Sequence, residues 1–225
     1  MKRNSQPKKT AIEDLLSVMA RLRSPTGCPW DREQDHKTLR FHAVEEVYEL
    51  IDAIEAGDDE EMLEELGDLL LQVVFHCQLA RERQSFNFEQ VTRNLVEKLI
   101  RRHPHVFGDQ KAKSVDEVWA QWEKIKRAEK KGTPHDRPSA LDGIPRHLPA
   151  LMRVEKLVKK ARKAKLLAPV SIPKSTSRLD LASQLFELAQ QAQAKGWSAE
   201  ELLRAEVQRR ERSLRKAERK QLSNP

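Results

Sequence analysis

The chain has 225 residues, of which 34% are charged, and its formal net charge is +7. It contains only seven glycines and few β-branched or aromatic runs, so the composition argues against a sheet and predicts an all-α fold of one large or two small domains. Apolar runs are too short to span a bilayer, and the polar, basic residues 1–9 lack a signal-peptide core. These features exclude a membrane protein and predict a cytoplasmic one with a disordered tail over residues 1–9.

The cysteine count and the charge also limit the function classes. Cys28 and Cys77 are too few for a disulfide framework and lack the CxxC spacing of a zinc site, which fits a reducing compartment. A basic pI of about 9.4 leaves three explanations open, namely nucleic-acid binding, binding of anionic small molecules such as nucleotides, or plain solubility.

The first predicted helix begins after Thr10, which forms a capping box with Glu13, and ends near Arg23. A loop rich in proline and glycine follows over residues 24–31 and carries Trp30. A tryptophan on a stiff loop is a candidate for stacking on a base, although loop tryptophans more often cover the edge of a core. Trp30 is therefore a weak base-binding candidate.

The stretch from residue 45 to residue 68 contains twelve Asp and Glu and no Lys or Arg. Like charges three or four residues apart destabilise a helix, so a compensating partner is expected. The pattern predicts two helices here, over residues 38–56 and 59–82, with Gly57 and Asp58 as the turn that folds the second back on the first. An apolar stripe at helical spacing lies on each helix, formed by Val44, Val47, Ile51 and Ile54 on the first and by Leu63, Leu66, Leu70 and Val73 on the second.

Two pairs of acids on these helices are candidates for a metal site. Residues three apart share a helix face, so Glu46 projects beside Glu49, and Glu65 projects beside Asp68. Converging carboxylates bind hard divalent cations, and Mg²⁺ is commonly held by a few carboxylates together with water and substrate phosphates. The alternative is two solvated acidic faces, which are common; the absence of any cation on the same segments favours the metal site.

A fourth helix is expected to begin at Asn87, with Gln90 as its capping partner, and to end at residue 103. The macrodipole favours cations in the last turns of any helix, and the same cations would suit phosphate binding; the spacing leaves both explanations open. The cations concerned are Lys98, Arg101 and Arg102.

The second half of the chain is basic. A helix from Ser114 precedes a proline-interrupted connector over residues 132–149. Further helices are expected over residues 151–165 and 181–195, and a last one from Ser198 carries clustered arginines and lysines.

Six motifs occur together and in order, and their combination is far more specific than any one of them. Together they resemble the MazG family of nucleoside triphosphate pyrophosphohydrolases, over about residues 10–165. The motifs are Gly27-Cys28-Pro29-Trp30-Asp31, Glu45-Glu46-x-x-Glu49, Glu65-Leu66-Gly67-Asp68, Arg101-Arg102-His103-Pro104-His105-Val106-Phe107, Trp122-Glu123-x-Ile125-Lys126 and Leu141-Asp142-x-Ile144-Pro145.

The resemblance implies an all-α NTP pyrophosphatase bundle completed by a second subunit, as a homodimer or higher homo-oligomer. It implies Mg²⁺-dependent hydrolysis of an NTP or dNTP between the α and β phosphates, giving a nucleoside monophosphate and pyrophosphate, with Mn²⁺ as a substitute metal. The metal ligands it implies are Glu46, Glu49, Glu65 and Asp68, with Glu45 nearby as a helper or water-orienting group. From the chemistry of such a reaction we expect the catalytic carboxylates to be Glu45, Glu46 and Glu49 and the phosphate-binding cations to be Lys98, Arg101, Arg102 and Lys126. Trp30 stays the weak candidate for base binding.

The resemblance also divides the chain into a MazG-like domain over residues 10–131, the connector, a degenerate second unit over residues 150–220 and a tail over residues 221–225. Laid over the first unit, Asp180 takes the place of Glu65 and Ser183 that of Asp68, while the EExxE helix is missing. We therefore expect the second unit to bind no metal and to serve dimerisation or packing.

A different class of function competes with the enzyme. The basic last helix favours a non-catalytic nucleotide or nucleic-acid binding protein that retains the fold, because clustered Arg and Lys bind phosphates without sequence specificity. A purely structural helical partner would leave the four-carboxylate pattern unexplained.

Overall fold

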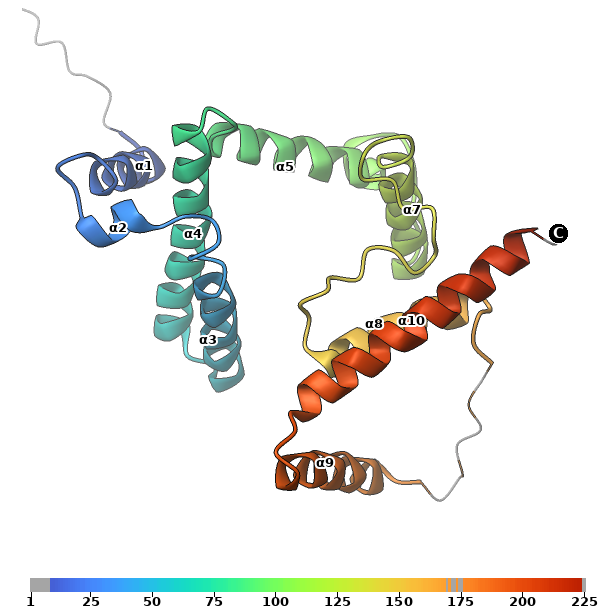
Figure 1. The fold of residues 1–225 in the computed structure, drawn as a ribbon. Coiled ribbons are helices and arrows are strands. Elements are labelled where there is room, and N and C mark those ends of the chain that lie inside the picture. Colours follow the sequence, from blue (N-terminus) through green and yellow to red (C-terminus); the bar gives the residue numbers. More distant parts are fainter. Residues whose placement is uncertain (1–8, 169, 171–172, 174–175, 224–225) are drawn as a thin grey trace, which may run out of the picture. The chain divides into compact units, whose positions relative to one another are not determined.

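Helices are the regular elements of the protein in the part that the computed structural model describes, which comprises residues 9–168, 170, 173 and 176–223. The predicted all-α class is confirmed for these residues, and no helix among them is long and apolar enough to cross a membrane. The tail expected over residues 1–9 lies outside the described residues apart from Lys9. The helices (Figure 1) are α1 (Ala11–Leu22), α2 (Pro29–Glu33), α3 (His42–Ala56), α4 (Asp59–Glu82), α5 (Phe88–Arg102), α6 (Pro104–Phe107), α7 (Val115–Ala128), α8 (Ala150–Lys163), α9 (Arg178–Ala194) and α10 (Ala199–Ser223).

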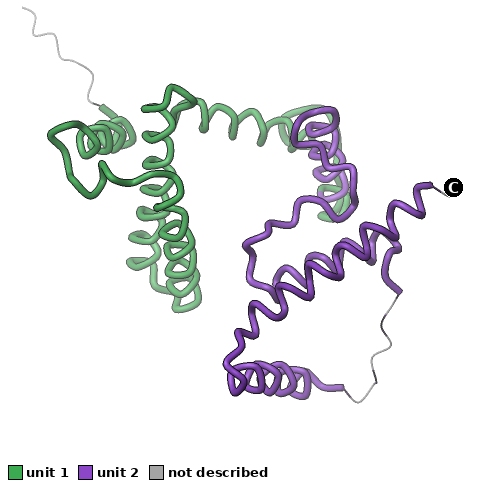
Figure 2. The backbone as a smooth tube through the Cα atoms, in the orientation of Figure 1, with its two compact units in different colours: residues 1–118 green, residues 119–225 purple. Residues whose placement is uncertain are grey.

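The chain separates into two compact units, residues 1–118 and 119–225, which are called unit 1 and unit 2 below (Figure 2). The division falls inside α7, whereas the sequence places the connector later, over residues 132–149. The expected division of function at the connector stays a prediction.

An antiparallel hairpin of α3 and α4 is the centre of unit 1 (Figure 1). Gly57 ends α3 with a φ of +68°, a left-handed conformation that glycine adopts at little cost. The Asp58 side chain then caps α4 by accepting the backbone N–H groups of Glu60 and Glu61 at 3.0 and 3.1 Å. The predicted turn is therefore confirmed, and α4 has the predicted bounds.

The predicted start of α3 is wrong by four residues. The sequence places it at residue 38, but the helix begins at His42. Asp35 Oδ1 accepts the backbone N–H groups of Lys37 and Thr38 at 2.6 and 2.8 Å, and the Asp35 N–H donates to Thr38 Oγ1 at 2.9 Å. This local turn competes with the helix for the same backbone groups, so α3 starts after it.

The C-terminal half of α4 packs into the core of unit 1. The predicted capping boxes at Thr10 and at Asn87 both form, and they fix the starts of α1 and α5, the helices that contact α4. The buried core consists of Met19, Leu39, Val74, Phe75 and Leu79.

Unit 2 is built on the pair α8 and α10, whose apolar sides meet over a buried cluster of Leu141, Leu157, Ala161, Val207 and Leu214 (Figure 1). α9 begins three residues earlier than expected because Ser177 caps it, and Asp180 serves as the partner in that capping box. The carboxylate of Asp180, the residue aligned with Glu65, thus accepts a hydrogen bond in the cap of α9. α10 continues to Ser223, three residues into the segment expected as a tail.

Candidate metal centre

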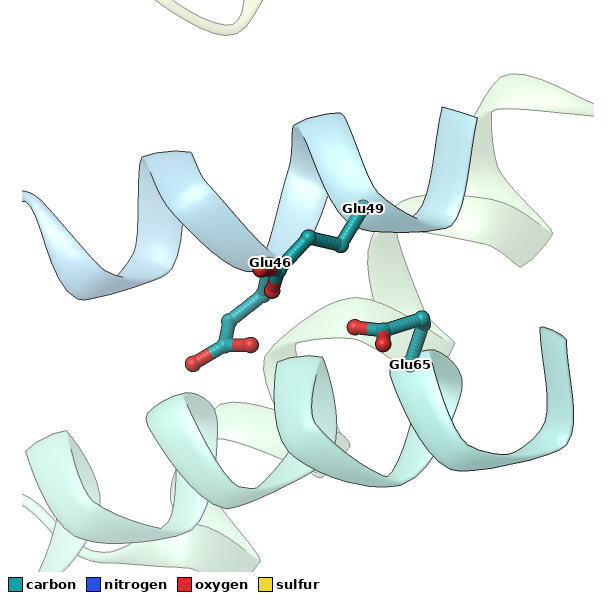
Figure 3. Close-up of side chains that lie close together, drawn as sticks. All are labelled: Glu46, Glu49 and Glu65. Carbon is teal, nitrogen blue, oxygen red and sulfur yellow. The ribbon is translucent and has the colours of Figure 1, made fainter. Parts of the chain in front are cut away.

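Three carboxylates converge between α3 and α4 (Figure 3). Glu46 and Glu49 come from α3 and lie one turn apart, and Glu65 comes from α4. One carboxylate oxygen from each of the three lies within 4.8 Å of the others. The hairpin produces this arrangement, because the turn at Gly57 brings the inward faces of the two acidic helices together.

The cluster is shielded on the α4 side. Glu65 is only 7% exposed, and its Oε2 is buried without a hydrogen-bond partner among the described residues. Gln72, two turns further along α4, is also buried and donates from Nε2 to Glu46 Oε1 at 3.1 Å, while its own Oε1 has no described partner. A buried acceptor without a donor is costly, so these oxygens indicate a ligand.

The electrostatics agree with the geometry. Burial raises the pKa of Glu49, and the charges of Glu45 and Glu46 raise it further. Burial also raises the pKa of Glu65, with further contributions led by Glu49 and Glu61. In both residues desolvation is the larger cause of the raised pKa and the neighbouring carboxylates add to it, although Glu65 is buried and Glu49 is exposed.

These residues fit a hard divalent cation. The donor set is all carboxylate oxygen, which suits Mg²⁺ or Mn²⁺ better than soft-ligand metals such as zinc. No described Lys or Arg forms an ion pair with Glu46, Glu49 or Glu65. The cluster therefore has an unbalanced negative charge, and the buried Glu65 Oε2 has no described donor. A bound cation would offset the charge and contact this oxygen.

The fourth expected ligand, Asp68, is half-buried and is not part of the group of three. Its charge nevertheless contributes to the raised pKa of both Glu49 and Glu65, so it lies near the cluster. Glu45 is exposed and faces His42, with 3.7 Å between Oε2 and Nδ1. The structure thus brings three of the four expected ligands together and leaves Asp68 and Glu45 at the edge.

A cleft of about 300 Å³ adjoins the cluster at the turn end of the hairpin. Glu49 belongs both to the cluster and to the cleft, so the cleft opens this edge of the cluster to solvent and to a ligand. It is lined by Glu49, Asp52, Ala53, Ala56, Asp58 and Glu61.

Trp30 belongs to the short helix α2, where the sequence predicts a loop, and it lies beside His42 at the start of α3. The residue is 53% exposed, and its ring meets the ring of His42 edge-on, with 6.2 Å between the centroids. Arg23 holds the segment that carries it: Nη1 donates to the backbone oxygens of Asp31 and Gln34, and the guanidinium forms two 2.7 Å hydrogen bonds with Glu82 of α4. Trp30 therefore has an exposed face on a fixed segment, next to the helix that carries Glu46.

The expected phosphate-binding cations are not part of the carboxylate cluster. Lys98, Arg101 and Arg102 lie in the last two turns of α5, where Lys98 and Arg102 are half-buried and Arg101 is exposed. Lys126 belongs to unit 2 and lies 3.4 Å from Glu123. Their role in binding phosphate stays a prediction.

Sequence reasoning missed Gln72. It lies seven residues after Glu65, on the same helix face, and is the one hydrogen-bonding amide within the apolar run from Leu69 to Cys77. A lone amide in such a run could have indicated a polar contact, but its partner on α3 depends on how the two helices pack.

The fold and the site together define an all-α protein with a carboxylate cluster between two antiparallel helices. A family model described as the MazG nucleotide pyrophosphohydrolase domain matches residues 34–107, which include the whole cluster. The chain is 58% identical over 119 residues to a Thermotoga maritima protein named nucleoside triphosphate pyrophosphohydrolase/pyrophosphatase MazG, covering 53% of this chain and 45% of that protein.

Two further relatives extend the match. A nucleoside triphosphate pyrophosphohydrolase of Escherichia coli K12 is 49% identical over 150 residues, which are 66% of this chain and 56% of that one. An uncharacterized 26.1 kDa protein of Streptomyces cacaoi is 41% identical over 207 residues, covering 91% of this chain and 81% of that protein. The chain belongs to the MazG family, and it spans about half the length of the first two relatives.

Proposed function

We propose that the protein hydrolyses nucleoside triphosphates, NTP or dNTP, at the α–β phosphoanhydride bond to a nucleoside monophosphate and pyrophosphate, with Mg²⁺ held between α3 and α4. Membership of the MazG family and the names of its relatives support this activity. The observation that carries the proposal is the convergence of Glu46, Glu49 and Glu65 around a buried carboxylate oxygen without a partner.

In the proposed reaction, residues of α3 and α4 would bind the metal and orient its ligands. Glu46, Glu49 and Glu65 hold the metal, with Asp68 as a further ligand or as a ligand to its bound water. Gln72 fixes the orientation of the Glu46 carboxylate by donating to it. A bound Mg²⁺ polarises phosphate oxygens and lowers the pKa of water.

A proton acceptor is also needed for attack by water. Glu49 is the better placed of the two candidates, because it borders the open cleft. Glu45 is the alternative, since it lies one turn before Glu49 and is exposed. Lys98, Arg101, Arg102 and Lys126 would neutralise the leaving pyrophosphate, and the exposed face of Trp30 would stack on the base.

The proposal includes a homodimer. The eight residues of the two apolar stripes are each at least 39% exposed on the single chain, and they lie on the same hairpin as the cluster. An exposed apolar surface of this kind marks an interface in a water-soluble protein. A second copy that packs its own hairpin on this surface would complete a bundle around the site.

The direct test is to incubate the protein with each NTP and Mg²⁺ and to separate the products. Monophosphate and pyrophosphate in equal amounts are expected, and EDTA should prevent their formation. Glu65→Gln should reduce turnover by at least about a hundredfold, since it removes a ligand charge. Release of diphosphate and inorganic phosphate would identify a different bond and overturn the proposal.

A further inference from the structure

Unit 2 carries an excess of positive over negative side chains, whereas unit 1 carries an excess of negative ones. Residues 119–225 include 25 Lys and Arg against 12 Asp and Glu, a formal charge of +13. Residues 1–118 include 17 Lys and Arg against 23 Asp and Glu, a formal charge of −6. The net charge of +7 is thus the sum of an acidic unit, which has the carboxylate cluster, and a strongly basic unit, of whose cations the proposed hydrolysis uses only Lys126.

Acidic side chains of unit 2 are engaged in contacts that hold the unit together. Glu211 of α10 lies 2.7 Å from the buried Arg153 of α8 and 2.8 Å from Arg215 on its own helix. The carboxylate of Glu200 accepts the backbone N–H of Ala150, at the start of α8, at 2.9 and 3.0 Å. These carboxylates face the α8–α10 interface and cannot neutralise cations on the outer surface.

The outer side of α10 carries cations without such partners. Its inner side is fixed by the buried Val207 and Leu214, and positions about half a turn away from these point outward. The only acids between residues 209 and 220 are Glu211 and Glu218, and both make inward contacts. Four outward residues are exposed and form no ion pair with any described residue, and together they are called the α10 row: Arg212, Lys216, Arg219 and Lys220.

We propose that the α10 row binds the phosphate backbone of a nucleic-acid duplex. Charges three or four residues apart on a helix are about 5–6 Å from each other, and the row extends for about 12 Å, so it can contact successive phosphates of one strand. Lys and Arg contacts of this type carry no sequence information, and they release counterions from the duplex. The expected binding is therefore independent of sequence and strongly weakened by salt.

The surroundings of the row favour a duplex over other polyanions. A helix that binds a membrane surface buries an apolar face in the lipid, but Leu214, the one large apolar residue between Arg209 and Lys220, is buried inside unit 2. Proteins that bind single strands stack aromatic side chains on the bases, and this stretch contains no aromatic residue.

The test measures binding of the full chain to fluorescent DNA and RNA duplexes of one sequence, by anisotropy, between about 50 and 200 mM salt. The variant Arg212→Gln, Lys216→Gln, Lys220→Gln removes three charges from the row. We expect its affinity at the lowest salt to fall at least about tenfold, and the slope of log K against log salt to fall by about 2.7. Tight binding of either duplex supports the proposal, and the ratio of the two affinities identifies the preferred nucleic acid.

The matched control removes the same charge from the same unit on a different surface. Lys156, Lys159 and Lys163 are exposed on the side of α8 opposite the buried Leu157 and Ala161, and so face away from α10. Changing all three to Gln should alter the affinity less than about threefold. Equal loss in both variants would show a general attraction and overturn the assignment to the α10 row.

Two other results would also overturn it: no duplex binding by the unmodified protein at the lowest salt, or equal binding to anionic lipid vesicles. Circular dichroism checks that each variant keeps its helices. Because neither variant changes the carboxylate cluster, NTP hydrolysis measured on the same samples tests the proposed function separately.

Discussion

Glu65 is the residue on which the candidate site depends most, because its buried Oε2 has no described partner and its neighbours are other carboxylates. Such a residue destabilises the fold when the metal is absent and stabilises it when a cation is bound. The same side chain therefore has opposite effects on the metal-free and the metal-bound protein, which makes the proposal testable by stability measurements alone.

We expect Glu65→Gln to raise the melting temperature of the metal-free protein at neutral pH, because the amide removes one negative charge from the cluster. The same change should abolish most of the stabilisation that added Mg²⁺ or Mn²⁺ gives to the unmodified protein. Differential scanning fluorimetry with and without metal measures both effects. Glu64→Gln, an exposed neighbour on α4, is the control and should behave like the unmodified protein.

The raised pKa values of Glu49 and Glu65 also predict a pH dependence. A carboxyl whose pKa is higher in the folded state than in the unfolded state binds its proton more tightly when folded, so its favourable effect is complete below the unfolded pKa of about 4.5 and is lost as the pH rises through the folded pKa. Without metal, the double variant Glu49→Gln, Glu65→Gln should match the unmodified protein near pH 4 and exceed its stability increasingly above it. Urea unfolding across this range is the measurement, and a constant difference would contradict the prediction.

At the scale of elements, the segment between α1 and α3 is fastened to α4 at two places. Arg23 binds Glu82, as described above. The second attachment is a chain of hydrogen bonds: Arg83 Nη2 donates to His36 Nε2 at 2.8 Å, and His36 Nδ1 lies 2.8 Å from His76 Nδ1. Since arginine only donates, His36 Nε2 must accept, and His36 Nδ1 must carry the hydrogen that it donates to His76.

This chain exists only while both imidazoles are neutral, because a proton on either one places two donors against each other. Burial and the neighbouring His36 lower the pKa of His76, so the contribution to stability is complete above the unfolded pKa of about 6.5 and is lost as the pH falls through the folded pKa. We expect the stability difference between the unmodified protein and His76→Phe to increase by about 1 kcal/mol from pH 5 to pH 7.5. His135→Phe, at an exposed position in unit 2, should show no such trend in the same denaturant titrations.

For the whole molecule, the exposed stripes on α3 and α4 predict self-association. Burying one large aliphatic side chain contributes about 1.5–3 kcal/mol, and a symmetric dimer contains each such contact twice. Ile51→Lys should therefore weaken the dimer by at least about a hundredfold, as measured by analytical ultracentrifugation. Val18→Lys, at a similarly exposed position on α1, is the control, and dissociation by this change as well would argue against a specific interface.

Much of unit 1 could be predicted from local signals. The turn at Gly57 and Asp58, the capping boxes at Thr10 and Asn87, and the facing of Glu46 beside Glu49 depend only on residues within four positions of each other. Local hydrogen bonds and helix periodicity decide such features, so the sequence carries them directly. The predicted start of α3 is too early because the turn at Asp35 is also a local feature. It uses the backbone groups that the helix periodicity assigns to the helix.

Other features were decided by tertiary structure. The periodicity of the two stripes predicts that each helix has an apolar face, but only the packing of α3 on α4 shows that these faces remain exposed on the single chain. Likewise, the pairing of Gln72 with Glu46 and the position of Asp68 outside the closest group depend on the relative rotation of the two helices.

By itself, the sequence of this protein determined the all-α class, the hairpin and the two pairs of acids, because helix geometry relates residues three and four positions apart. The tertiary structure alone decided which carboxylates meet, which oxygen is buried without a partner, and which cations of α10 lack an acidic neighbour. Burial and contacts across helices join residues far apart in the chain, and no local pattern encodes the rotation and depth at which two helices pack.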